Sequence, residues 1–301
     1  MASPTPFAYN APMFPLLIAG LLAVPSSTTP DTAPLGSPVA QWSAYIDSLD
    51  KDELDSFSRA ITSFKDCCTQ LPAAQVDSIF KSFQTFFFAT ISRHNDLMWE
   101  NLDFLERLHS RERPRAPDIE AFLEVLEPNG LGLFTLGDLY YIDQRADYLY
   151  RQFYPYVSLA LKDYLNLRKM ELAAGFSDDE MLVISYAQLG ARIVAWEHYQ
   201  DKYPGSIMAE SAQYYYRVYL STFLTGLRRS PVFGPGGVLD PVVKRAYASF
   251  FRRHDATRAG RLVEDFYFLL AEEDFRWSAP IKKFYRREGI INMHTFQVPY
   301  R

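Results

Sequence analysis

The chain has 301 residues, enough for one large or two modest domains at about 100–200 residues each, and 48% are hydrophobic, enough to bury a core. A net charge of −5 and a pI of about 5.6 exclude a general nucleic-acid binder, for which a domain pI above ~9 is typical. Aromatic residues reach 16%, most of them Tyr and Phe. Tyr and Trp side chains offer large, stiff, amphipathic surfaces, so the composition favours a binding surface.

Residues 1–40 differ from the rest and resemble a signal-like apolar segment followed by a Pro/Ser/Thr-rich linker. The apolar run from Phe14 to Val24 is too short to span a bilayer as a helix, which takes about 20 residues, but it matches a signal-peptide core. No Lys or Arg precedes the run, and Met13 is an alternative start. We expect a protein exported to the periplasm or cell surface, without a transmembrane span. The alternative is a cytoplasmic protein with a disordered tail.

From residue 41 to residue 301, apolar residues recur at spacings of three and four, which predicts an all-α domain. Its helices are expected to form stacked hairpins, in an irregular repeat-like or compact helical array. Residues 131–137 are the least helical stretch and fit a loop or a short strand pair. Residues 231–237 are rich in Pro and Gly and mark a candidate internal boundary.

The clearest predicted element is a helical hairpin between Phe176 and Leu227. Ser177 and Glu180 have the spacing of a capping box, which predicts that the first helix begins there. The segment Tyr203–Ser206 contains Pro204, which disfavours helical geometry in the residue before it, so the first helix ends at this turn. Ser206 can cap the second helix.

From Trp196 to Tyr216 this hairpin resembles the tetratricopeptide-like helical repeats. It is most similar to cell-envelope proteins whose helix pairs join through a Tyr-Pro-x-Ser turn, here Tyr203-Pro204-Gly205-Ser206. The resemblance covers one repeat of about 34 residues. Such repeats usually form binding surfaces, so it implies a binding protein.

These observations predict a non-enzymatic interaction or scaffold protein of the cell envelope, with Tyr and Trp side chains around the central hairpin. A protein or peptide is the expected partner, a carbohydrate is the alternative, and no nucleic acid or cofactor is expected. A cytosolic partner-binding protein is a further alternative. The candidate binding residues are Trp196, Glu197, Tyr140, Tyr141, Tyr203 and Tyr215.

A hypothesis from a different class is an all-α hydrolase with a pair of carboxylates. Glu197 is a candidate for a buried general acid, and Asp138 follows a glycine-bounded loop. A paired-carboxylate mechanism requires both groups in one cleft, within about 10 Å. The competing hypothesis is structural, with Glu197 in an ion pair with Arg192 or Arg217.

The His and Cys residues predict no metal site. Five histidines are scattered without ligand spacing, and no Cys-x-x-Cys pair is present. Cys67 and Cys68 are adjacent. Because a disulfide between neighbours closes a strained ring, we expect free thiols.

Overall fold

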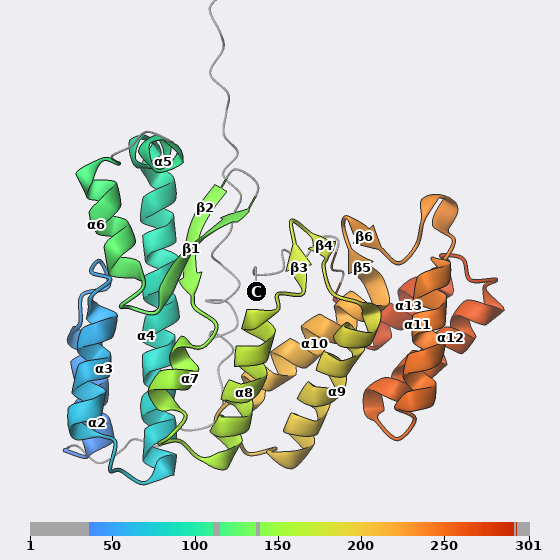
Figure 1. Ribbon diagram of the computed structural model, residues 1–301. Coiled ribbons are helices and arrows are strands. Elements are labelled where there is room, and N and C mark those ends of the chain that lie inside the picture. The colour runs from blue at the N-terminus through green and yellow to red at the C-terminus, as the bar shows by residue number, and fades with distance from the viewer. Residues whose placement is uncertain (1–35, 111–114, 137–138, 292, 294–301) are drawn as a thin grey trace, which may run out of the picture. The chain divides into compact units, whose positions relative to one another are not determined.

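A computed structural model describes residues 36–110, 115–136, 139–291 and 293 of the chain. Within these ranges it contains twelve α-helices and three antiparallel pairs of short strands (Figure 1). The prediction of an all-α, compact helical array is therefore confirmed. None of the described helices is both long and apolar enough to cross a bilayer.

Several predicted features lie outside the described residues: the apolar run at 14–24, the alternative start Met13 and the candidate acid Asp138. The Pro- and Gly-rich residues 231–237 begin at the last residue of strand β6 (Ser230–Pro231) and end with the short 3-10 helix η1 (Pro235–Gly237).

Helix α4 (Ala73–Glu100) is the centre of the first half of the described chain. It is 28 residues long and contains no glycine or proline that would interrupt it. It contacts α2, α5 and a strand pair, so it buries side chains on more than one side. The other helices here are α2 (Pro38–Ser48), α3 (Ser56–Cys67), α5 (Leu102–His109) and α6 (Pro117–Leu126).

The least helical stretch forms a strand pair, β1 (Leu131–Leu136) and β2 (Leu139–Gln144), with Leu131 opposite Gln144. Asn95 of α4 holds this pair in place. Its Nδ2 donates to the carbonyl of Ile142 (3.0 Å), and its Oδ1 accepts from the N–H of the same residue (2.7 Å). The buried Asn95 amide thus takes the place of a third strand for β2.

The second half of the chain consists of helices that pack in antiparallel pairs. Helices α9 and α10 pack along each other, as do α11 and α12, and α9 also contacts α8, α11 and α12. The turn from α9 to α10 falls at Pro204–Gly205, as predicted, and the Ser206 hydroxyl accepts from the N–H of Met208 (3.1 Å). The helices are α7 (Tyr148–Phe153), α8 (Leu159–Ala173), α9 (Tyr186–Lys202), α10 (Ala209–Thr225), α11 (Pro241–Arg253), α12 (Arg258–Glu272) and α13 (Ala279–Arg287).

The predicted start of the first hairpin helix is wrong. Residues from Ser177 to Leu182 form a small hairpin, β3 (Ser177–Asp178) and β4 (Met181–Leu182), and α9 begins at Tyr186. Its capping box is formed by Ser185 and Gln188.

Two arginines about 50 residues further along the chain explain why no helix begins at Ser177. Arg228 and Arg229 connect β5 (Gly226–Leu227) to β6, and they form ion pairs with Glu180 and Asp179 respectively. The N–H of Arg229 also donates to the carbonyl of Glu180 (3.0 Å). The two acids thus face cations in a neighbouring turn and do not serve a helix N-terminus.

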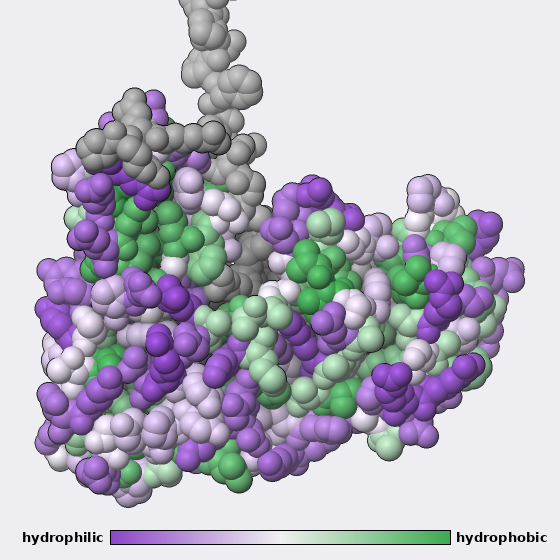
Figure 2. All heavy atoms as spheres, viewed as in Figure 1, coloured by the Kyte–Doolittle hydropathy of each residue, from purple (hydrophilic) through white to green (hydrophobic). Residues whose placement is uncertain are grey.

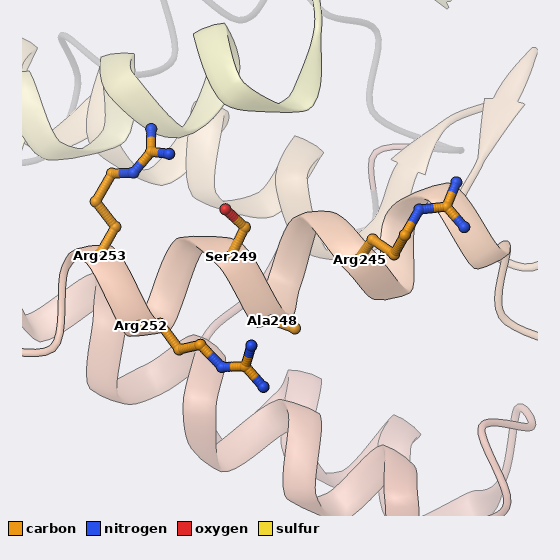
Figure 3. A pocket seen from close by; sticks show the side chains of 5 residues that line it. All are labelled: Arg245, Ala248, Ser249, Arg252 and Arg253. Atoms are coloured by element: carbon orange, nitrogen blue, oxygen red, sulfur yellow. The ribbon is translucent and has the colours of Figure 1, made fainter.

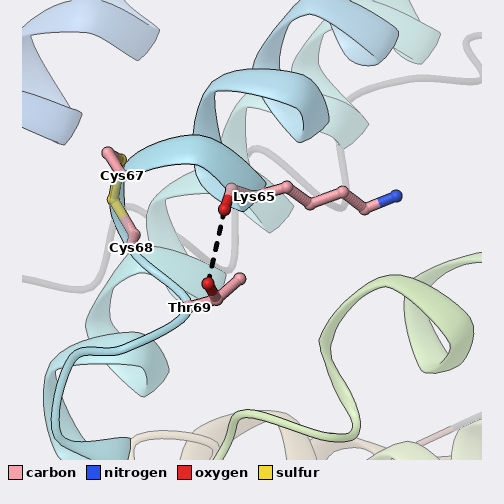
Figure 4. The surroundings of a disulfide bond; sticks show 4 residues. All are labelled: Lys65, Cys67, Cys68 and Thr69. Carbon is pink, nitrogen blue, oxygen red and sulfur yellow. Dashed lines mark hydrogen bonds between the residues drawn. A yellow bond between two sulfur atoms is a disulfide. The ribbon is translucent and has the colours of Figure 1, made fainter.

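The expectation of free thiols is also wrong, because Cys67 and Cys68 form a disulfide (Figure 4). Side chains of neighbouring residues point about 100° apart on a helix. Here Cys67 is the last residue of α3, and Cys68 has left helical geometry with φ −126° and ψ −6°, so the two side chains can meet. Cys67 is exposed and Cys68 is buried.

Candidate functional site

Trp196 is fully buried in the middle of α9. Its Nε1 donates to Oε1 of Glu171 on α8 (2.5 Å), and its ring stacks on Tyr215 of α10 with centroids 5.1 Å apart. Trp196 therefore joins three helices in the core and contributes no surface for a partner.

The same Glu171 carboxylate holds a buried arginine. Nη1 of Arg168 donates to Oε2 of Glu171 (2.7 Å), and the guanidinium lies 3.9 Å from the ring centroid of Tyr215. Both charged residues are less than 10% exposed. Glu171 thus accepts one hydrogen bond at each oxygen, which is the condition for keeping such a pair buried.

A small cavity lies beside this ion pair, with about 20 Å³ of space for the centres of water molecules. That volume suits one ordered water among polar side chains, and it is too small for a substrate. Its polar lining includes Gln84, Gln144, Tyr164, Arg168 and Tyr215.

The buried tyrosines around the ion pair are held in their neutral form. Burial raises the pKa of Tyr164, Tyr215 and Tyr219 above the ordinary value of about 10. At neutral pH these phenols can donate hydrogen bonds, and none is available as a phenolate base.

Glu197 is buried on the other side of α9, where it caps a neighbouring helix. Its two carboxylate oxygens accept from the backbone N–H groups of Arg258 (2.5 Å) and Ala259 (2.9 Å), at the start of α12. The exposed Arg258 side chain lies 3.7 Å away, Nε to Oε1. Both oxygens are therefore engaged with the N-terminus of α12, where negative charge is favourable.

The predicted arginine partners of Glu197 are wrong. Arg192 donates to the carbonyl of Ala174, and Arg217 donates to the carbonyl of Gly289 (3.1 Å). The actual partner, Arg258, lies 61 positions along the chain, which local spacing on α9 does not indicate.

The remaining candidate residues lie in separate places. Tyr140 belongs to a second apolar cluster around Met98, and its carbonyl accepts from Trp99 Nε1 (2.7 Å). Tyr141 packs against Phe134 across the strand pair, with centroids 5.7 Å apart. Tyr203, half-buried, donates to Asp163 of α8 (2.6 Å). The six predicted residues therefore do not form one surface.

The outer face of α8 was missed by sequence analysis. Leu159 and Met170 are 62% and 61% exposed, three helical turns apart on the face opposite the buried side chains of α8. Tyr150 and Tyr154 of the preceding segment stack with centroids 4.4 Å apart, and two lysines of α8, Lys169 and Lys162, lie over these rings at 4.0 and 5.6 Å. We call the set of Tyr150, Tyr154, Leu159, Met170 and Tyr203 the α8 surface.

The signal for this surface is present in the sequence. The buried α8 residues Leu161, Tyr164 and Leu165 are three or four positions apart and share one face of the helix. Leu159 and Met170 do not fit this spacing, so they lie on a different face. Among the residues that the structure describes, no three His, Cys, Asp or Glu side chains are placed to hold a metal ion.

Glu197→Ala tests the capping role. The change leaves the N–H groups of Arg258 and Ala259 without their acceptor, the second of them buried, so we expect the free energy of unfolding to fall by about 2–4 kcal/mol. Urea denaturation measures it. The control is Asp201→Ala, which removes an exposed partner of the same Arg258 and should change stability by about 0.5 kcal/mol or less. Equal effects of the two changes would contradict the capping role.

Alkaline titration tests the buried tyrosines. Folding raises their pKa, so their contribution to stability is complete below pH 10 and is lost as pH rises above it, where the unfolded chain ionises first. Each protected phenol lowers the free energy of unfolding by up to ~1.4 kcal/mol per pH unit above 10. Ultraviolet absorbance of tyrosinate, with circular dichroism, follows the process. Ionisation of all 20 tyrosines near pH 10 in a folded protein would contradict it.

No protein-family model matches this chain, and neither a curated protein nor a solved structure matches it. The resemblance to tetratricopeptide-like repeats remains a prediction that rests on the α9–α10 hairpin.

Proposed function

We propose that the protein is a non-enzymatic interaction protein that binds a protein or peptide partner on the α8 surface. The observation that carries the proposal is the pair Leu159 and Met170, both more than 60% exposed, flanked by the stacked rings of Tyr150 and Tyr154. Met and aromatic residues are enriched in the buried centres of protein interfaces. Met also adapts its shape to a partner.

The surroundings of the α8 surface suit an interface of this kind. Lys162 and Lys169 lie over Tyr154 and Tyr150, and Lys202 with Tyr203 contacts Asp163 on the other flank. Apolar and charged side chains thus lie together on this face, and protein interfaces commonly combine both. The β3–β4 hairpin, which follows α8 in the chain, exposes Met181 and Val183, and Figure 2 shows a hydrophobic patch there.

The hydrolase hypothesis receives no support from Glu197, because both of its oxygens are engaged by α12. Its proposed partner Asp138 lies outside the described residues, so the carboxylate pair remains a prediction.

Site-specific photocrosslinking tests the interaction. A photoreactive phenylalanine analogue in place of Met170 should give a discrete adduct in the native cells, whereas the same analogue at the exposed Gln213 of α10 should not. Adding Leu159→Asp, an exposed change expected to alter stability by about 0.5 kcal/mol or less, should reduce the Met170 adduct at least ~10-fold. Identical adducts from both positions would contradict an α8 interface.

We further propose that the protein is exported. The apolar run at 14–24 supports this, and so does the Cys67–Cys68 disulfide, because disulfides persist in oxidising compartments. Intact-mass measurement of the native protein in each cell fraction tests it. The expected result is a mass lacking about the first 25–35 residues, outside the cytoplasm. A full-length mass in the cytosol would favour the cytosolic partner-binding alternative.

A further inference from the structure

Helix α11 buries one face and leaves the opposite face open to solvent. The buried face consists of Val243, Tyr247 and Phe250. The open face carries Arg245, Ala248, Ser249, Arg252 and Arg253, whose side chains project from one side of the helix into solvent (Figure 3). In Figure 3 two arginines stand at the ends of this stretch, Arg245 and Arg253, with Ala248 and Ser249 between them.

The three arginines on the open face of α11 have no acidic partner. In the described parts of the chain, Arg245, Arg252 and Arg253 form neither a hydrogen bond nor an ion pair through their side chains. Ten other arginines there pair with a carboxylate, whereas Arg276 and Arg286, like the three α11 arginines, do not; the ten are Arg59, Arg93, Arg107, Arg145, Arg151, Arg168, Arg228, Arg229, Arg258 and Arg287. The guanidinium of Arg252 lies 6.0 Å from the centroid of the Phe251 ring, and the hydrogen-bond donors of all three α11 arginines remain open to an external anion.

The charge of this part of the chain has the opposite sign to that of the whole. From Pro241 to Arg301 there are twelve Lys and Arg against seven Asp and Glu, although the complete chain carries a net charge of −5. The open face of α11 therefore belongs to a positively charged part of an acidic protein, which favours the approach of a negatively charged ligand.

The spacing of the arginines indicates the form of the ligand. Arg245 and Arg252 lie one above the other, seven residues apart, which is about 10.5 Å along the helix axis. In a polyproline II segment, residues three apart lie on the same side and about 9.3 Å apart. Two carboxylates at that spacing match the two guanidiniums, each of which can bind a carboxylate through two hydrogen bonds.

We propose that the open face of α11 binds an extended acidic segment of a partner protein, with Asp or Glu at every third residue. Arg245 and Arg252 bind two successive carboxylates, Arg253 binds at the flank and Ser249 donates a hydrogen bond between them. The acidic pI of the chain argues against a nucleic acid as the ligand, although Phe251 lies beside Arg252 and could stack on a base. This binding site is independent of the α8 surface.

Fluorescence anisotropy with a labelled peptide of five Glu-Pro-Ala repeats tests the proposal on the full-length protein. We expect saturable binding that weakens as salt rises, and no binding of the matching Gln-Pro-Ala peptide. Each single Arg→Ala change at these three positions should weaken binding about 1.4- to 5-fold, the range for exposed ion pairs of 0.2–1 kcal/mol. The triple variant R245E/R252E/R253E should weaken it at least ~10-fold.

The matched control is K282E/K283E/R286E on α13, which makes the same change in net charge at three exposed residues. It should leave the affinity within about 2-fold, and circular dichroism should show both triple variants folded. R245K/R252K/R253K keeps the charge but not the paired hydrogen bonds, so an intermediate affinity is expected.

Four results would overturn the proposal. Equal weakening by the two triple variants would show that bulk charge alone causes the binding. Equal binding of the Gln peptide would remove the role of carboxylates. Tighter binding of single-stranded DNA than of the peptide would assign the open face of α11 to nucleic acid. Low-salt self-association, seen by light scattering and abolished by R245E/R252E/R253E, would assign it to a second copy of this chain.

Discussion

Two consecutive residues of α9 join it to the helices on both sides. Trp196 donates to Glu171 of α8, and Glu197 accepts two backbone hydrogen bonds from the start of α12. Consecutive side chains on a helix point about 100° apart, so one Trp-Glu pair can reach two different neighbours. The packing of the second half of the chain depends on these contacts, because α8 and α12 each meet α9 there.

The cost of burying charge makes these contacts specific. An unpaired carboxylate in the interior costs several kcal/mol, whereas Glu171 and Glu197 each have a partner at both oxygens. If α9 moved by one helical turn, about 5.4 Å, along its axis, Glu171 would lose Trp196 and keep only Arg168 of its own helix, and Glu197 would lose both N–H groups of α12. Apolar side chains that shift by the same distance leave no buried charge unpaired. The two acids therefore fix the register of three helices.

The sequence predicted those parts of the structure that depend only on residues close to one another in the chain. Pro204 and Gly205 set the turn between α9 and α10 whatever surrounds them. The start of α9 was missed because the Ser177–Glu180 spacing suits a capping box as well as a hairpin, and Arg228 and Arg229, about 50 residues away, decide between them. The burial of Glu197 was foreseen and its partner was not. In a chain with 16% aromatic residues, spacing alone did not distinguish the buried Trp196 from a surface residue.

Helix α9 also supports the two surfaces that carry the proposed functions, since α8 and α11 both pack against it. The two surfaces would bind their partners through different kinds of interaction. Leu159 and Met170 would bind through apolar burial, which salt does not screen, whereas the α11 arginines act through charge that is screened beyond about 8 Å at physiological ionic strength. A partner held by α8 would therefore stay bound as salt rises, and an acidic segment on α11 would dissociate. Two contacts of such different kinds on one rigid support allow separate partners, each released under its own conditions.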